Sequence, residues 1–296
     1  MVQDKSIGSR LFDWSNVFLL AILGLACLLP FVHVVAVSLS SSGPASANAV
    51  TFWPKDFTLE NYSAATSNPR LWNAFFWSIM RVVVGTLLTL SISILTAYPM
   101  SRDSNVFRAR TVFVVLFLFA MLFDSGIIAR FAVIRMIGLY DTFWVLVVPG
   151  AFSPWIIVLL MNFFRNLPKE MEEAAVIDGA NHFDILFRIY IPLSTAAIAT
   201  TGLFTMVGLW NDWFTAMLYL RSPDMYPLQT YLQNFLNITN IRELFSMGDV
   251  ETFIKLVSNR GLRTATLALS LIPIMMVYPL LQRYFVKGIV LGAVKG

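Results

Sequence analysis

Charged, amide and aromatic side chains inside apolar runs are the first candidates for chemistry in this chain. Arg81 and Asp124 each interrupt a long apolar run, and Asn211, Asp212 and Trp213 stand together in another. Ionisable groups are costly in a bilayer and usually face a cavity or a partner helix. An amide and a carboxylate beside an aromatic ring could contact the hydroxyls and the ring face of a sugar. These five residues are therefore candidates for a translocation path, although hydrogen bonds between helices would also explain them.

The chain offers little for catalysis or for metal binding. Its one cysteine, Cys27, lies in an apolar run, and its two histidines, His33 and His182, are far apart in the sequence. The motifs of zinc peptidases (HExxH), serine hydrolases (GxSxG) and P-loop ATPases are missing. We therefore expect no catalytic residue, no metal site and no cofactor in this chain. The energy for transport then has to come from a partner or from a gradient.

A polar hairpin, residues 166–192, lies between two apolar runs. Pro168 suits a first helical turn, and the acidic residues after it lie near the positive end of the helix dipole. Asp178 and Gly179 form a turn signal, because glycine accepts a positive φ without steric cost. A second helix follows, with apolar residues three or four apart. Its predicted apolar stripe consists of Phe183, Leu186, Phe187 and Tyr190.

The elements that hold these residues are membrane helices by composition. Hydrophobic residues make up 57% of the 296 residues, charged residues only 13%, and the mean hydropathy is +0.71. The net charge of +4 is modest, and the basic groups gather near the ends of apolar runs, which indicates membrane orientation rather than nucleic-acid binding. Six apolar runs of about 20 residues or more can each cross a bilayer. The predicted spans are 17–38, 73–98, 111–130, 142–164, 193–220 and 264–286.

We expect one all-α domain, residues 1–296, because a backbone in lipid must satisfy its own hydrogen bonds. The core of the domain covers about 73–286. Six spans place both termini on one side, and a slight excess of Lys and Arg on that side favours the cytoplasm. The loop 221–263 then faces outward, where it either contacts a partner or acts as a passive cap.

The hairpin resembles the EAA loop of ABC importer permeases. The match covers Glu173-Ala174-Ala175 and Gly179 and ends at Ile189-Tyr190-Ile191-Pro192, with Ile191 in place of the usual leucine. In that family the loop is a coupling helix that docks in a cleft of a cytoplasmic ATPase subunit. The resemblance assigns ATPase coupling to Glu173, Ala174, Ala175, Asp178, Gly179, Ala180, Phe183 and Pro192. It implies the type I importer permease fold in a bacterial cytoplasmic (inner) membrane.

The resemblance extends beyond the hairpin. Ala97-Tyr98-Pro99-Met100-Ser101-Arg102 is similar to the family's Ala-Tyr-Ala-x-Ser-Arg, with Pro99 in place of an alanine. Residues 126–142 and 210–214 resemble the carbohydrate (maltose-type) branch of the family. The glycine-rich tail 288–296 is similar to a tail that inserts between two ATPase subunits in relatives. This implies ATPase contacts for Gly292, Lys295 and Gly296.

The resemblance also implies partners and a substrate class. The partners are a second homologous permease, two ATPase subunits that bind ATP and Mg, and an extracytoplasmic solute-binding protein. The substrate is an oligo- or polysaccharide, and one candidate match is the smaller permease of a bacterial alginate importer. An ABC permease for a non-sugar solute remains an alternative. A gradient-driven secondary transporter would need inverted repeats or broken helices with ion-binding carboxylates, and the sequence shows no clear repeat. A membrane-embedded enzyme would need a paired nucleophile and base, which the sequence lacks.

Overall fold

The computed structural model describes residues 7–103, 105–123, 125–237, 260–273 and 275–276. Helices account for most of these residues. The described ranges hold no β-strand, only an isolated bridge between Ser40 and Phe57. The chain divides into two compact units, one of residues 1–69 with 234–272 and one of residues 70–233 with 273–296. The expectation of a single permease domain stays a prediction.

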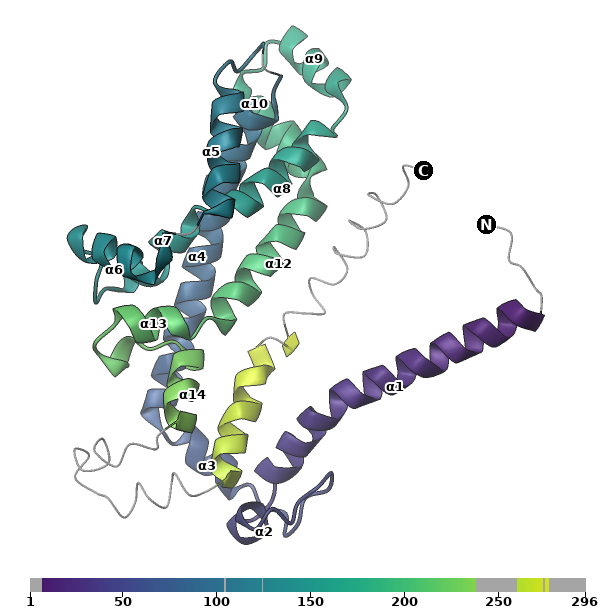
Figure 1. Cartoon of the computed structure of the whole chain (residues 1–296), viewed down its shortest axis with the longest axis vertical. Helices are drawn as coiled ribbons and strands as arrows, with labels where there is room; N and C mark the ends of the chain where they lie inside the picture. Colours follow the sequence, from purple (N-terminus) through teal and green to yellow (C-terminus); the bar gives the residue numbers. More distant parts are fainter. Residues whose placement is uncertain (1–6, 104, 124, 238–259, 274, 277–296) are drawn as a thin grey trace. The chain divides into compact units, whose positions relative to one another are not determined.

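The first unit is built on α1 (Ile7–Ser38), a single helix of 32 residues that includes the predicted first span and begins before it (Figure 1). Two short helices follow, α2 (Ser42–Ser46) and α3 (Glu60–Thr66), and residues 260–272 of this unit are helical as well. The α1 helix is long and apolar enough to cross a membrane.

Asn61 on α3 ties the first unit together. Its side-chain amide is buried and donates hydrogen bonds to the carbonyls of Ser38 and Ser40, at 2.9 and 2.8 Å. A Cβ atom at Gly261 would lie 2.5 Å from the same amide nitrogen. Glycine is therefore required there, because only a residue without a side chain lets the helix of residues 260–272 approach Asn61 so closely.

The second unit is organised along α4 (Pro69–Ser101), a continuous helix of 33 residues (Figure 1). It includes the predicted span 73–98 and extends it at both ends. Pro99 lies inside the last turn without ending the helix, which runs on to Ser101. Buried residues along α4 include Arg81 near its middle and Tyr98 near its end.

The predicted span 111–130 is not one helix. The α5 helix (Arg110–Leu122) ends early, and a separate helix, α6 (Gly126–Met136), begins at a glycine with a φ of +74°. A positive φ cannot continue a right-handed helix, so Gly126 marks a change of direction. The apolar run alone could not reveal this interruption, because both helices have membrane-like composition.

The predicted span 142–164 is also interrupted. It consists of the 3₁₀ turn η1 (Phe143–Leu146), α7 (Val148–Ala151) and α8 (Pro154–Arg165), with a bend of 43° between the first two and α8. Ser153 is extended before Pro154, as expected because proline disfavours the helical region for the residue before it.

The predicted span 193–220 breaks at both of its ends. The segment His182–Leu193 meets α12 (Thr195–Asn211) at an angle of 79°. At the other end, Asp212 is extended, and the short helix α13 (Phe214–Tyr219) follows. The loop 221–263 holds the 3₁₀ turn η3 (Pro223–Met225) and α14 (Leu228–Asn237) in its described part.

Within the described residues, α1 and α4 are the two unbroken helices that are long and apolar enough to span a membrane, or five spans result if each bent pair counts as one. The predicted sixth span, 264–286, is described only through residue 276, with residue 274 left out. The count of six therefore stays a prediction.

Candidate functional site

The hairpin of residues 166–192 lies at the end of the second unit where α4 finishes (Figure 1). Its first helix, α9 (Lys169–Ile177), ends in the predicted turn. Gly179 has a φ of +78°, its N–H donates to the carbonyl of Val176 at 3.0 Å, and the Ala180 N–H donates to that of Ala175 at 2.9 Å. This pair of bonds is a Schellman motif, which satisfies the last carbonyls of a helix. The turn at Gly179 is confirmed.

The second arm begins at a side-chain cap that was not predicted from the sequence. Asn181 accepts hydrogen bonds from the backbone N–H groups of Phe183 and Asp184, at 2.9 and 3.0 Å. The helix α10 (His182–Ile185) starts directly after it. An asparagine just before an apolar helical segment is a known start signal and could have revealed this cap.

The predicted single apolar stripe on this arm is wrong. After α10 the backbone widens into a π-helical turn, η2 (Leu186–Tyr190), before α11 (Ile191–Leu193). Leu186 and Tyr190 are buried, whereas Phe183 and Phe187 are exposed. The Ile191 N–H bonds to the carbonyl of Leu186, five residues back. Proline has no N–H for the usual helical bond, which accounts for a widened turn just before Pro192. Because a π turn changes which residues share a face, the four apolar residues do not form one stripe.

A buried arginine, Arg102, joins the two arms of the hairpin to the end of α4. Its guanidinium forms an ion pair with Glu172 on α9 and donates to the Tyr98 hydroxyl. The Tyr190 hydroxyl donates to the same Glu172 carboxylate at 2.7 Å. The guanidinium also lies over the rings of Tyr98 and Tyr190, 4.4 and 5.2 Å from their centroids. We call these four residues the Arg102 cluster.

The Arg102 cluster was not predicted as a site. Tyr98 and Arg102 lie in a motif that resembles the family's, without a predicted role, and the predicted coupling residue is Glu173 rather than its neighbour Glu172. Helical geometry explains the difference, because neighbouring residues point about 100° apart on a helix. Glu172 therefore faces the core, whereas Glu173 is exposed.

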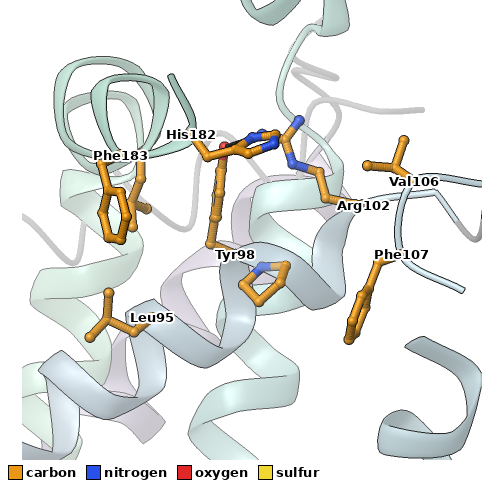
Figure 2. Close-up of a pocket in the computed structure, with 9 residues that line it drawn as sticks. Leu95, Tyr98, Arg102, Val106, Phe107, His182 and Phe183 are labelled. Carbon is orange, nitrogen blue, oxygen red and sulfur yellow. Dashed lines mark hydrogen bonds between the residues drawn. The ribbon is translucent and has the colours of Figure 1, made fainter. Parts of the chain in front are cut away.

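A pocket of about 350 Å³ lies beside this cluster (Figure 2). Figure 2 shows His182 and Arg102 above the hydroxyl end of Tyr98, with Phe183 on one side and Phe107 on the other. The Tyr98 hydroxyl and Nδ1 of His182 lie 3.5 Å apart. The pocket is lined by Leu95, Tyr98, Pro99, Arg102, Val106, Phe107, His182, Phe183 and Leu186.

The outer surface of the hairpin combines apolar and acidic residues. Ile177 is 85% exposed and Phe183 is 68% exposed, and Val176, Met171 and Phe187 are exposed as well. Among the predicted coupling residues, Ala175 and Ala180 pack partly buried against the core. The other members of the predicted set are exposed: Glu173, Ala174, Asp178, Gly179, Phe183 and Pro192.

An exposed ion pair links the base of the hairpin to the segment after α4. The Lys169 ammonium donates to the Asp103 carboxylate at 2.7 Å. This hydrogen bond, and then the positive charge of Lys169, hold the pKa of Asp103 below its usual value of 3.8.

Two of the predicted path residues lie together at the break between α12 and α13. The buried Arg81 guanidinium forms an ion pair with the Asp212 carboxylate. It also donates to the backbone carbonyl of Asp212 at 2.7 Å and to that of Leu146 at 3.2 Å. The other carboxylate oxygen of Asp212 accepts the N–H groups of Phe214 and Thr215, each at 3.1 Å. Asp212 thus caps α13 while Arg81 holds the break.

The remaining path candidates are distributed differently. Asn211 is exposed, and Trp213 is 37% exposed, with its ring 5.5 Å from that of Phe214. Asp124 lies outside the described residues, as do the tail residues Gly292, Lys295 and Gly296. In the part of the chain that the structure describes, no three His, Cys, Asp or Glu side chains gather as a metal site would require.

Comparison with known proteins gives a consistent result. "Protein LplC" of Bacillus subtilis (strain 168) is 35% identical over 287 residues, which cover 97% of this chain and 96% of that protein. The polygalacturonan/rhamnogalacturonan transport system permease protein YtcP of the same organism is 34% identical over 290 residues, or 97% of this chain and 99% of that protein.

A solved structure has the same fold. It is a crystal structure of a bacterial ABC transporter involved in the import of the acidic polysaccharide alginate, with a TM-score of 0.86 and 31% identity over 96% of this chain and 100% of that chain. The family model of binding-protein-dependent transport system inner membrane components matches residues 81–291. The chain therefore belongs to this family of ABC importer permeases, which are inner-membrane transport subunits rather than ATPases themselves.

Proposed function

We propose that this chain forms half of the translocation path for an oligo- or polysaccharide in a binding-protein-dependent importer. Family membership supports the transport role. The names of YtcP and of the alginate importer support a saccharide, and both of those substrates are acidic polysaccharides. Alginate oligosaccharide is thus one candidate for the transported solute.

The exposed apolar tip of the hairpin is the observation that carries the coupling role. Ile177 and Phe183 are large apolar side chains exposed outside the predicted spans, with the carboxylate of Glu173 nearby in the sequence. Exposed apolar groups among polar ones usually mark a surface that another protein covers. We assign that role to an ATPase subunit, with Glu173 making a charge-assisted contact and Ala174 allowing close approach.

The Arg102 cluster connects this surface to the membrane helices. A hairpin that is held to α4 through one guanidinium can move α4 when the ATPase subunits close on ATP and Mg. Because α4 is continuous, the movement reaches Arg81 and, through it, the break at Asp212. The mechanism requires that the hairpin contact the two ATPase states differently, since an equal interaction with both states shifts no equilibrium.

The assembled importer completes the proposal. A second homologous permease encloses the path, two ATPase subunits bind the nucleotide, and an extracytoplasmic binding protein delivers the saccharide. The chain crosses the bilayer six times with both termini in the cytoplasm. The tail of residues 288–296, through Gly292, Lys295 and Gly296, contacts the ATPase subunits.

Reconstitution of this chain with its partner permease, ATPase subunits and binding protein tests the function. We expect ATP hydrolysis that rises when the binding protein carries a saccharide. An Ile177→Asn/Phe183→Asn variant should insert normally but lose the stimulation. Ile137→Asn is the control, because Ile137 is 55% exposed on a segment predicted to face the other side of the membrane.

The outcomes separate the two parts of the proposal. Full stimulation in the double variant would show that the ATPase docks elsewhere. Stimulation by a peptide- or amino-acid-loaded binding protein, and by none from a saccharide panel, would retain the importer and reject the sugar.

A further inference from the structure

Two arginines contact one tyrosine ring in the part of the second unit around α6 and α13, away from the hairpin (Figure 1). Arg135 comes from the last turn of α6, and Arg221 follows α13. Their guanidinium carbons lie 5.7 and 5.3 Å from the centroid of the Tyr140 ring. We call Arg135, Tyr140 and Arg221 the arginine platform.

The platform is held by backbone bonds between distant segments. The backbone N–H of Asp141 donates to the carbonyl of Tyr219 at 3.0 Å, and the Asp141 carboxylate accepts a hydrogen bond from the backbone N–H of Arg221 at 2.8 Å. Asp141 has a φ of +60°, a conformation that costs a side-chain-bearing residue energy and persists where its surroundings enforce it. The segment is therefore fixed before any ligand arrives, which reduces the entropy lost on binding.

Aromatic contacts support the same arrangement. The Phe131 ring meets the Tyr140 ring edge to face, with centroids 5.6 Å apart. It also stacks on Tyr219 of α13 at 5.9 Å. The ring that both guanidinium groups contact thus packs against Phe131 of α6, which in turn packs against α13.

The hydrogen-bonding edges of both guanidinium groups are open. A cation–π contact uses the face of a guanidinium and leaves its N–H groups free for an acceptor. Arg135 and Arg221 are exposed, and within the described residues neither side chain forms an ion pair or donates a hydrogen bond to an acceptor. Two like charges on one ring repel each other, so an anion that bridges them gains from both.

We infer that the arginine platform binds carboxylates of an acidic saccharide, a chain of uronate units, on its way into the translocation path. The inference rests on the proposed function and narrows its substrate class. A guanidinium fork matches a carboxylate through two parallel hydrogen bonds. Both guanidinium carbons lie within 5.7 Å of one ring centroid, so a single saccharide chain can meet both.

Equilibrium binding of fluorescently labelled trigalacturonate to the assembled importer in lipid nanodiscs, without the binding protein, tests the inference. The wild type should bind it saturably and more weakly at high salt. Arg135→Gln/Arg221→Gln should weaken binding about tenfold, as expected for two exposed charge pairs. Arg108→Gln, which changes another exposed arginine, should bind like the wild type.

Two further arms distinguish charge from fork geometry and from folding. The fully methyl-esterified trigalacturonate should bind the wild type as weakly as the free acid binds the double glutamine variant. Arg135→Lys/Arg221→Lys keeps both charges without the fork and should give intermediate affinity. Basal ATP hydrolysis and the thermal midpoint of the assembled importer serve as the folding controls and should be normal in every variant.

Equal affinity of the wild type and the double glutamine variant for trigalacturonate would overturn the inference. If that variant instead required more loaded binding protein for half-maximal ATP hydrolysis, the platform would be a docking site for carboxylates of the binding protein. Either result leaves the saccharide importer intact, whereas failure of every saccharide to stimulate hydrolysis would reject the proposed function itself.

Discussion

Two buried arginines, Arg81 within α4 and Arg102 directly after it, act at two different regions of the second unit. Arg102 contacts side chains, namely Glu172 and the rings of Tyr98 and Tyr190. Arg81 contacts the backbone carbonyls of Leu146 and Asp212, together with the Asp212 carboxylate.

The difference indicates that the contacts at the end of α4 can rearrange, whereas those near its middle are part of the fold. Side-chain contacts such as those of Arg102 can separate and re-form without changing the helices that carry them. Hydrogen bonds from Arg81 to carbonyls at helix interruptions define the interruptions themselves, because those carbonyls lack helical partners. We therefore expect Arg81 to matter most for stability and Arg102 for coupling.

The largest effect should follow from Arg81→Met. This change leaves the Asp212 carboxylate and two carbonyls without their cation inside the protein, a loss of about 3–5 kcal/mol. The thermal midpoint of the purified protein in detergent measures it, with Arg108→Met, an exposed arginine, as the control. Arg81→Met/Asp212→Asn should recover part of the loss. A variant Arg81→Met as stable as Arg108→Met would remove the distinction between the two arginines.

The second effect concerns the turn of the hairpin. Gly179→Pro removes the N–H that bonds to Val176 and forbids a φ of +78°, at a cost of about 3 kcal/mol to the turn. We expect normal membrane insertion and loss of saccharide-stimulated ATP hydrolysis in the reconstituted importer. Gly179→Ala should cost about 1–2 kcal/mol and keep part of the stimulation, because a Cβ there meets no atom within 4 Å. Undiminished stimulation in Gly179→Pro would contradict the coupling role.

A smaller effect should separate Glu172 from Glu173. Glu172→Gln retains an acceptor for Tyr190 but loses the charge that pairs with Arg102, a cost of about 1–2 kcal/mol. Glu173→Gln should leave the stability of the isolated subunit unchanged within about 0.5 kcal/mol, since Glu173 is exposed. Denaturation of both variants in detergent checks this. Equal losses of stability in Glu172→Gln and Glu173→Gln would mean that the contacts of the Arg102 cluster do not stabilise the fold.

The smallest effect is the pH dependence of the Lys169–Asp103 pair. The pKa of Asp103 is lower in the folded state than its usual 3.8, so its contribution to stability is complete above that pH. The contribution is lost as the pH falls through the folded-state pKa. A comparison of wild type with Asp103→Asn should show a small stability difference at pH 7 that disappears under acid. If the stability difference between the two proteins grew as the pH fell, the pKa of Asp103 would not be lowered in the folded state.

The sequence predicted the hairpin well because local chemistry decides it. Gly179 has the expected positive φ, and α9 begins at Lys169, with Pro168 just before the helix rather than in its first turn. The same reasoning failed for the apolar stripe, because the π turn at Leu186–Tyr190 changes the helical period. Pro192 indicated that the helix would be irregular nearby, but a proline alone does not predict whether the irregular turn lies before or after it.

The membrane helices likewise include features that the sequence predicted and features that it did not. The long runs of α1 and α4 were predicted because twenty or more apolar residues are sufficient evidence of a span. The interruption at Asp212 was not, since an aspartate in an apolar run can equally face a cavity or pair with another helix. Its partner Arg81 lies 131 residues away, and nothing local identifies it.

By itself, the sequence determined an all-α membrane protein with a polar hairpin between two apolar runs, and its motifs supplied the resemblance to ABC importer permeases. Composition, run length and turn chemistry are local properties, so they can be read without coordinates. The tertiary structure decided which charges pair, that Glu172 rather than Glu173 meets Arg102, and that Arg81 holds the break at Asp212. These contacts depend on how helices distant in the sequence pack together. Packing energy depends on distances in three dimensions, which cannot be read from the order of residues.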